Sequence, residues 1–204
     1  REGNLGMFES WVEGALSSPL GSGGGQFDNF SSAGKTKIPA FATHLRSAIQ
    51  GVGGWDDDFI SCQDSDLSMR MIEQGYCLMR CPETTVSMAK RTSVARWWKM
   101  GHRYGFWRTK TVLRHPKRIS LREYAPWFGL VLSTALFALS NEYWVIPAVL
   151  YGVVLLVEAL RSSIRNRRIS LLIGIPICLF MLHTSFSIGL LDGLLRKGKA
   201  ASDR

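Results

Sequence analysis

The sequence predicts an α/β domain that is followed by an α-helical membrane region. In residues 1–120 polar and apolar residues alternate in short segments, which is typical of a soluble domain built from helices and strands. From Ala125 to Leu195 the chain is overwhelmingly apolar, and its segments approach the roughly 20 residues that a membrane-spanning helix needs. We therefore expect an α/β part over residues 1–114, an interfacial linker over 115–124, about three membrane helices over 125–195 and a basic tail over 196–204.

An acidic loop is conspicuous in the first part, because the whole chain carries a net charge of +9. Five aspartates lie between Asp56 and Asp66. Asp64 and Asp66 stand where a helix is expected to begin, and Asp66 can pair with Arg70 one turn later. Backbone N–H groups keep a carboxylate ionised in the first turn of a helix. Such a group can take a proton from an attacking hydroxyl, so the loop is a candidate catalytic site, and a solvated acidic loop is the alternative.

The flanking segments predict further local structure. Leu67 and Met71 form the apolar face of the helix that follows the loop, and Gly75 is placed to end it. We expect short strands over residues 76–82 and 84–89, then a helix that Ser93 caps. The four cysteines show neither the spacing of a metal site nor a disulfide framework, so we expect free thiols.

A basic stretch that also contains Trp runs from Lys90 to Arg122. It holds eleven Lys and Arg residues and no Asp or Glu. Cations interleaved with Trp suit a membrane surface, where aromatic rings lie at headgroup depth and cations meet anionic lipid. Nucleic acid is the rival partner for such a stretch. The apolar segments that follow favour the membrane, so we expect membrane lipids and no nucleic acid as partners.

Three apolar segments follow, over residues 125–140, 145–160 and 169–191. The arginine-rich residues 161–168 belong on the cytoplasmic side by the positive-inside rule, and the same rule places the basic stretch there. The third segment leaves two interpretations open: a full span, or a shorter span followed by an interfacial helix. We expect three passes, with two passes and an interfacial helix as the alternative.

The segments VGGWDDDF, QDSDLSMRMIEQGY and RWWKMGHRYGFWRTKTVLRHP occur in this order before the apolar segments. In this combination the chain resembles membrane-anchored family 2 glycosyltransferases, above all the bacterial type that acts in succinoglycan and other exopolysaccharide assembly. The resemblance covers about residues 21–195 and implies the C-terminal part of a GT-A-like, Rossmann-like domain followed by a transmembrane region. The nucleotide-binding strands and Asp-x-Asp metal motif of that family would precede Arg1. The resemblance therefore implies Mg²⁺ or Mn²⁺ as cofactor, held mainly by residues outside this sequence.

The resemblance also assigns roles to residues of this chain. It implies that Asp64 is the catalytic base on the acceptor hydroxyl and that Asp66 is its companion at the helix start. Arg103 and Tyr104 would contact the donor diphosphate and the acceptor. The acceptor pocket would be shaped by Gly53, Gly54 and Trp55.

The implied function is an inverting transfer of a sugar from a nucleotide sugar, with a UDP-sugar expected, to a lipid-linked or polysaccharide acceptor. The reaction would take place at the cytoplasmic face of the inner membrane. Gln63 departs from the Glu that is usual in the family, which removes one charge but keeps Asp64. Two alternatives remain: an enzyme that transfers to polyprenyl phosphate, and a non-enzymatic membrane module that binds anionic lipid or a partner through the basic stretch.

Overall fold

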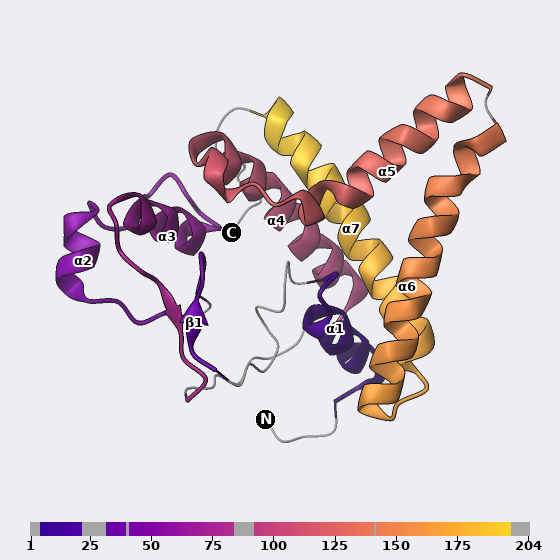
Figure 1. Ribbon diagram of the computed structural model, residues 1–204, viewed down its shortest axis with the longest axis horizontal. Coiled ribbons are helices and arrows are strands. Elements are labelled where there is room, and N and C mark those ends of the chain that lie inside the picture. The colour runs from indigo at the N-terminus through magenta and orange to yellow at the C-terminus, as the bar shows by residue number, and fades with distance from the viewer. Residues whose placement is uncertain (1–4, 22–31, 40, 84–91, 141, 197–204) are drawn as a thin grey trace.

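The computed structural model describes residues 5–21, 32–39, 41–83, 92–140 and 142–196, and these are mostly helical. The α-helices are α1 (Met7–Ser17), α2 (Arg46–Gly51), α3 (Gln63–Glu73), α4 (Val94–Arg114), α5 (Leu121–Ala138), α6 (Val145–Asn166) and α7 (Leu171–Leu195). Two short 3₁₀-helices, η1 (Pro116–Arg118) and η2 (Glu142–Trp144), flank α5. In Figure 1, α2, α3 and the strands lie on one side, α5, α6 and α7 lie on the other, and α4 lies between them.

The sheet that the described residues form has two antiparallel strands, β1 (Gly34–Lys35) and β2 (Met79–Arg80). Gly34 lies opposite Arg80 and Lys35 opposite Met79. The strand expected over residues 76–82 is therefore shorter than predicted, because only two of its residues have a partner on β1. The strand expected over 84–89 lies outside the described residues. The α/β, GT-A-like class stays a prediction.

The local signals for helix ends are confirmed. α3 begins at Gln63 with Asp64 and Asp66 in its first turn, and Gly75 follows its end with a φ of +90°. The Ser93 hydroxyl accepts a hydrogen bond of 3.3 Å from the backbone N–H of Arg96 at the start of α4. The four cysteines are free, as predicted.

Helices α4 and α7 pack backbone against backbone along a glycine seam, which we define as Gly101, Gly105, Gly189 and Gly193. A Cβ atom at Gly105 would lie 2.0 Å from the carbonyl oxygen of Phe186. A Cβ atom at Gly189 would likewise lie 2.1 Å from the carbonyl oxygen of His102. The four-residue spacing puts both glycines of each helix on one face, which permits this close approach.

Two hydrogen bonds flank the glycine seam. The Trp97 indole N–H donates to the carbonyl oxygen of Cys178 at 2.9 Å, and the Thr109 hydroxyl donates to that of Leu190 at 2.9 Å. Both donors belong to α4 and both acceptors to α7. The buried Trp97 also joins the largest apolar core, to which α1, α6 and α7 contribute. The basic helix α4 is thus fixed along most of its length to the apolar helix α7.

Two stretches within the described residues are long and apolar enough to cross a membrane: Glu142–Asn166 and Leu171–Leu195. They contain α6 and α7 and overlap the second and third predicted segments. α6 continues to Asn166, so residues 161–166 of the arginine-rich 161–168 segment are helical, and Arg167 with a φ of 53° follows the helix end. The first predicted segment forms α5, and the number of membrane passes stays a prediction.

Candidate functional site

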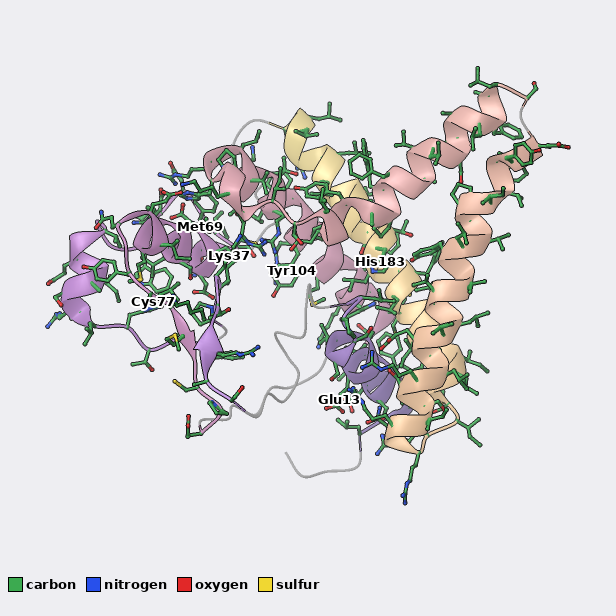
Figure 2. All side chains as sticks on the ribbon, viewed as in Figure 1. Glu13, Lys37, Met69, Cys77, Tyr104 and His183 are labelled. Carbon is green, nitrogen blue, oxygen red and sulfur yellow. The ribbon has the colours of Figure 1, made fainter. Side chains whose placement is uncertain are left out.

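A large open cleft runs between the α2–α3 side of the molecule and helices α4–α7. Four of the seven predicted site residues line it: Trp55, Asp64, Arg103 and Tyr104. They come from the loop before α3, the first turn of α3 and the middle of α4. Figure 2 marks Tyr104 on α4 and His183 on α7, which also lines the cleft. The fold therefore brings together side chains up to 49 residues apart in sequence.

The Asp64 carboxylate is solvent-exposed in the first turn of α3. It makes no ion pair or hydrogen bond with the side chains of the described part of the chain. The turn is tight because Cys62, the N-cap residue, has a φ of 60° and its carbonyl oxygen accepts from the N–H groups of Ser65 and Asp66. An exposed carboxylate with free oxygens, facing a cleft, is available to accept a proton from a bound hydroxyl.

Asp66 has the opposite environment, because it is completely buried. Its Oδ2 lies 2.8 Å from Arg70 Nε, which confirms the predicted pair, and its Oδ1 lies 3.4 Å from Arg114 Nη1. Oδ1 also lies 2.9 Å from Nε2 of the buried His115. The Asp66 carboxylate is thus held on three sides, and the geometry gives it a positioning role for the start of α3. A direct role in catalysis stays a prediction.

His115 connects the end of α4 to α3. Its Nδ1 lies 2.9 Å from Glu73 Oε1, while its Nε2 lies 2.9 Å from Asp66 Oδ1. Each ring nitrogen of His115 thus lies at hydrogen-bond distance from one carboxylate, so the ring bridges the two acidic side chains of α3. We call Asp66, Arg70, Glu73, Arg114 and His115 the polar junction. The contacts of His115 could not be predicted from the sequence, because its partners are 42 and 49 residues away.

The glycines before Trp55 act through the backbone. Gly53 and Gly54 have φ values of +83° and +77°, a conformation that side chains disfavour, and a Cβ atom at either would meet no atom within 4 Å. Neither lines the cleft, whereas the half-exposed Trp55 that follows them does. The turn therefore places Trp55, and the predicted contact of the two glycines with an acceptor stays a prediction.

Asp56 in the acidic loop is paired with Arg114. This hydrogen bond, followed by one from the N–H of Asp58, lowers the pKa of Asp56 from its ordinary value of 3.8. Arg114 thereby contacts both the loop and the buried Asp66. Arg114 thus joins the acidic loop to α4, where Phe59 of the same loop also packs against Trp107.

The described residues contain no group of three or more His, Cys, Asp or Glu side chains that could hold a metal ion. The carboxylate of Asp56 is paired with Arg114, and that of Asp66 is paired with other residues of the polar junction. These residues do not supply a ligand set for the expected Mg²⁺ or Mn²⁺, which prefer several oxygen ligands.

The cleft also contains charged side chains that the sequence did not indicate. Arg108, Arg118 and Glu123 line it beside the predicted residues, and both arginines contact Glu123. They come from α4, η1 and α5, and no regular spacing links them. Only their shared position on the cleft wall identifies them.

Comparison with known proteins gives one informative similarity. The chain is 26% identical over 142 residues to the dolichyl N-acetyl-alpha-D-glucosaminyl phosphate 3-beta-D-2,3-diacetamido-2,3-dideoxy-beta-D-glucuronosyltransferase of Methanococcus voltae. The aligned region is 70% of this chain and 42% of that glycosyltransferase, so the chain spans less than half of its relative's length. No family model and no solved structure matches the chain.

Proposed function

We propose that this protein is a glycosyltransferase that moves a sugar from a nucleotide sugar to a lipid-linked or polysaccharide acceptor. The main support for the proposal is the cleft, which is lined by the exposed carboxylate of Asp64 together with Arg103 and Tyr104. The similarity to a glycosyltransferase named for a dolichyl-linked sugar phosphate supports both the reaction type and a lipid-linked acceptor.

The reaction is a single displacement that inverts the sugar's anomeric carbon. Asp64 takes the proton of the acceptor hydroxyl while that oxygen forms a bond to the anomeric carbon. The bond between this carbon and the diphosphate oxygen breaks, and the nucleoside diphosphate leaves with the electron pair. Arg103 offers a cation to the diphosphate, and the rings of Trp55 and Tyr104 offer flat faces to the sugars.

The position of the cleft suits a reaction at the cytoplasmic face of a membrane. Its wall includes residues of α6 and α7, the helices long and apolar enough to cross a membrane. It also includes Arg103 and Arg108 of the basic helix α4, which suits contact with anionic lipid. An acceptor that is anchored in the membrane would reach Asp64 along this wall.

The test is nucleotide-sugar turnover by membranes that contain the full-length protein, across a panel of UDP- and GDP-sugars. Wild type is expected to release nucleoside diphosphate, and Asp64→Asn is expected to lower the rate about 10²- to 10⁴-fold, because the base is lost. Asp57→Asn is the matched control, since it removes the same charge from the acidic loop outside the cleft lining. It should keep wild-type turnover.

Equal turnover by wild type and Asp64→Asn would show that another group is the base and would contradict the assignment of Asp64 as the catalytic base. Absence of turnover with every donor, together with binding to anionic vesicles that is unaffected by Asp64→Asn, would contradict the enzyme proposal. It would support instead a membrane module that acts through the basic stretch.

A further inference from the structure

Two arginines share one carboxylate on the wall of the cleft. Arg108 Nε lies 3.0 Å from Glu123 Oε2, and Arg118 Nη2 donates to Glu123 Oε1 at 3.2 Å. The arginine side chains are each 14% exposed and that of Glu123 is 12% exposed. The cluster thus has two cations and one anion largely withdrawn from water.

Several nitrogens of this cluster remain without a hydrogen-bond partner among the described residues. They are Nε and Nη1 of Arg108 and Nε of Arg118. The 3.0 Å approach of Arg108 Nε to Glu123 is an ion pair without hydrogen-bond geometry. Burial, and next the charge of Arg108, lower the pKa of Arg118. Buried charged donors without partners are costly, and an anion bound between the two guanidinium groups would satisfy them.

The cluster lies at a junction within the cleft. On one side it is near the start of α3, because Cys62, two residues before Asp64, packs against the cluster that contains Trp107, the neighbour of Arg108 in α4. On the other side the cleft continues over apolar and aromatic side chains of α5, α6 and α7. These include Trp127, Leu130, Phe137, Tyr151, Phe180 and Phe186. An anionic group bound here would thus have the candidate base on one side and an apolar wall on the other.

We propose that Arg108 and Arg118 bind the phosphate of a lipid-linked acceptor, whose hydrocarbon chain lies along the apolar wall of α5, α6 and α7. Phosphate oxygens accept from the unpartnered guanidinium nitrogens, and Glu123 holds the two arginines in place. A free nucleoside diphosphate has no chain to cover the apolar wall, so the combined charge and apolar surface favour a lipid phosphate. This inference rests on the proposed function and names its acceptor class.

The test is equilibrium binding to the full chain in detergent, with four probes: farnesyl phosphate, farnesol, inorganic phosphate and UDP. Farnesyl phosphate should bind more tightly than farnesol or inorganic phosphate, because it uses both parts of the site. Arg118→Gln should weaken farnesyl phosphate binding about 10- to 100-fold, since charge-assisted hydrogen bonds are lost, and should leave farnesol binding unchanged. Lys117→Gln is the matched control, because it removes a neighbouring exposed charge outside the cleft lining and should bind as wild type does.

A second variant protects the test against misfolding. Glu123→Gln keeps a side-chain oxygen that can accept from the arginines and so hold them in place, but it removes the negative charge that competes with phosphate. It should therefore bind farnesyl phosphate more tightly than wild type, a gain that an unfolded chain cannot show. Unchanged affinity in both Arg118→Gln and Glu123→Gln would overturn the site. Binding of UDP that depends on Arg118 and displaces farnesyl phosphate would also overturn it, because the cluster would then serve the donor.

The same measurements separate this inference from the proposed function. Binding requires no chemistry, so Asp64→Asn should bind farnesyl phosphate as wild type does. Normal binding with no transfer by wild type in membranes would leave the phosphate site standing while the proposed function fails. Normal transfer with no effect of Arg118→Gln on farnesyl phosphate binding would contradict the phosphate site alone.

Discussion

Helix α4 is held at two places by opposite kinds of chemistry. Along its middle, the glycine seam lets its backbone touch that of α7, and the contact depends on the absence of side chains. At its C-terminal end, Arg114 and His115 hold α3 through the polar junction, and the contact depends on charge. The α7 side is therefore fixed by close backbone packing, while the side that carries Asp64 is attached through polar and charged groups beside the contact of Phe59 with Trp107. The second attachment should respond to charge changes that leave the first intact.

The largest expected effect is loss of the buried carboxylate in the polar junction. Asp66→Asn leaves Arg70 and His115 facing a neutral amide, and removing one partner of a buried ion pair costs about 3–5 kcal/mol. Hydrogen exchange of the α3 amides should accelerate strongly, whereas amides of α4 and α7 along the glycine seam should keep their protection.

Asp64→Asn is the matched control for this measurement, because it makes the same change two residues earlier at an exposed carboxylate. It should leave α3 exchange unchanged even where it abolishes turnover. Unaltered α3 exchange in Asp66→Asn would show that the junction does not hold α3. Equal acceleration in α3 and α7 would show that the two attachments are not independent.

The next effect concerns the glycine seam. Gly105→Ala places a methyl group where the Phe186 carbonyl oxygen lies, so α4 and α7 must separate, at a cost of about 1–3 kcal/mol or more. Thermal unfolding in detergent should show a lower midpoint, and exchange should rise in α4 and α7 but less in α3. Gly152→Ala in α6 is the control, because its Cβ would meet no atom within 4 Å and the midpoint should not fall. A midpoint unchanged in Gly105→Ala would contradict the close packing.

The same contrast explains what the sequence could predict. Asp64 and Gly75 were placed correctly at the two ends of α3, and Ser93 at the start of α4, because capping depends on residues within one turn. The resemblance to a family supplied Trp55 and Arg103, which do line one cleft. The four-residue glycine spacing could be read from the sequence, but not which helix each pair faces.

Contacts between distant segments could not be predicted. His115 meets Asp66 across 49 residues, and Arg118 meets Glu123 only because η1 turns the chain between α4 and α5. No spacing rule links such residues, since burial and charge select them only after the elements have packed. Those side chains support the start of α3 or line the cleft, so the sequence indicated the candidate site residues better than the side chains that support them.

The smallest expected effect is at the solvent-exposed ion pair between Asp56 and Arg114, next to the polar junction. The pKa of Asp56 is lower in the folded protein than its ordinary value of 3.8. The pair therefore stabilises the fold at pH values above 3.8, and this stabilisation is lost as the pH falls through the lowered pKa. The Arg114 side chain is 44% exposed, so the contribution is under about 1 kcal/mol. Asp56→Asn should therefore lower the unfolding midpoint slightly at pH 7, and the difference from wild type should shrink below pH 3.8 and in 1 M salt. A difference that persists in acid and in salt would contradict the assignment of this effect to the charge pair, because Asn keeps the side-chain oxygen that accepts from the N–H of Asp58.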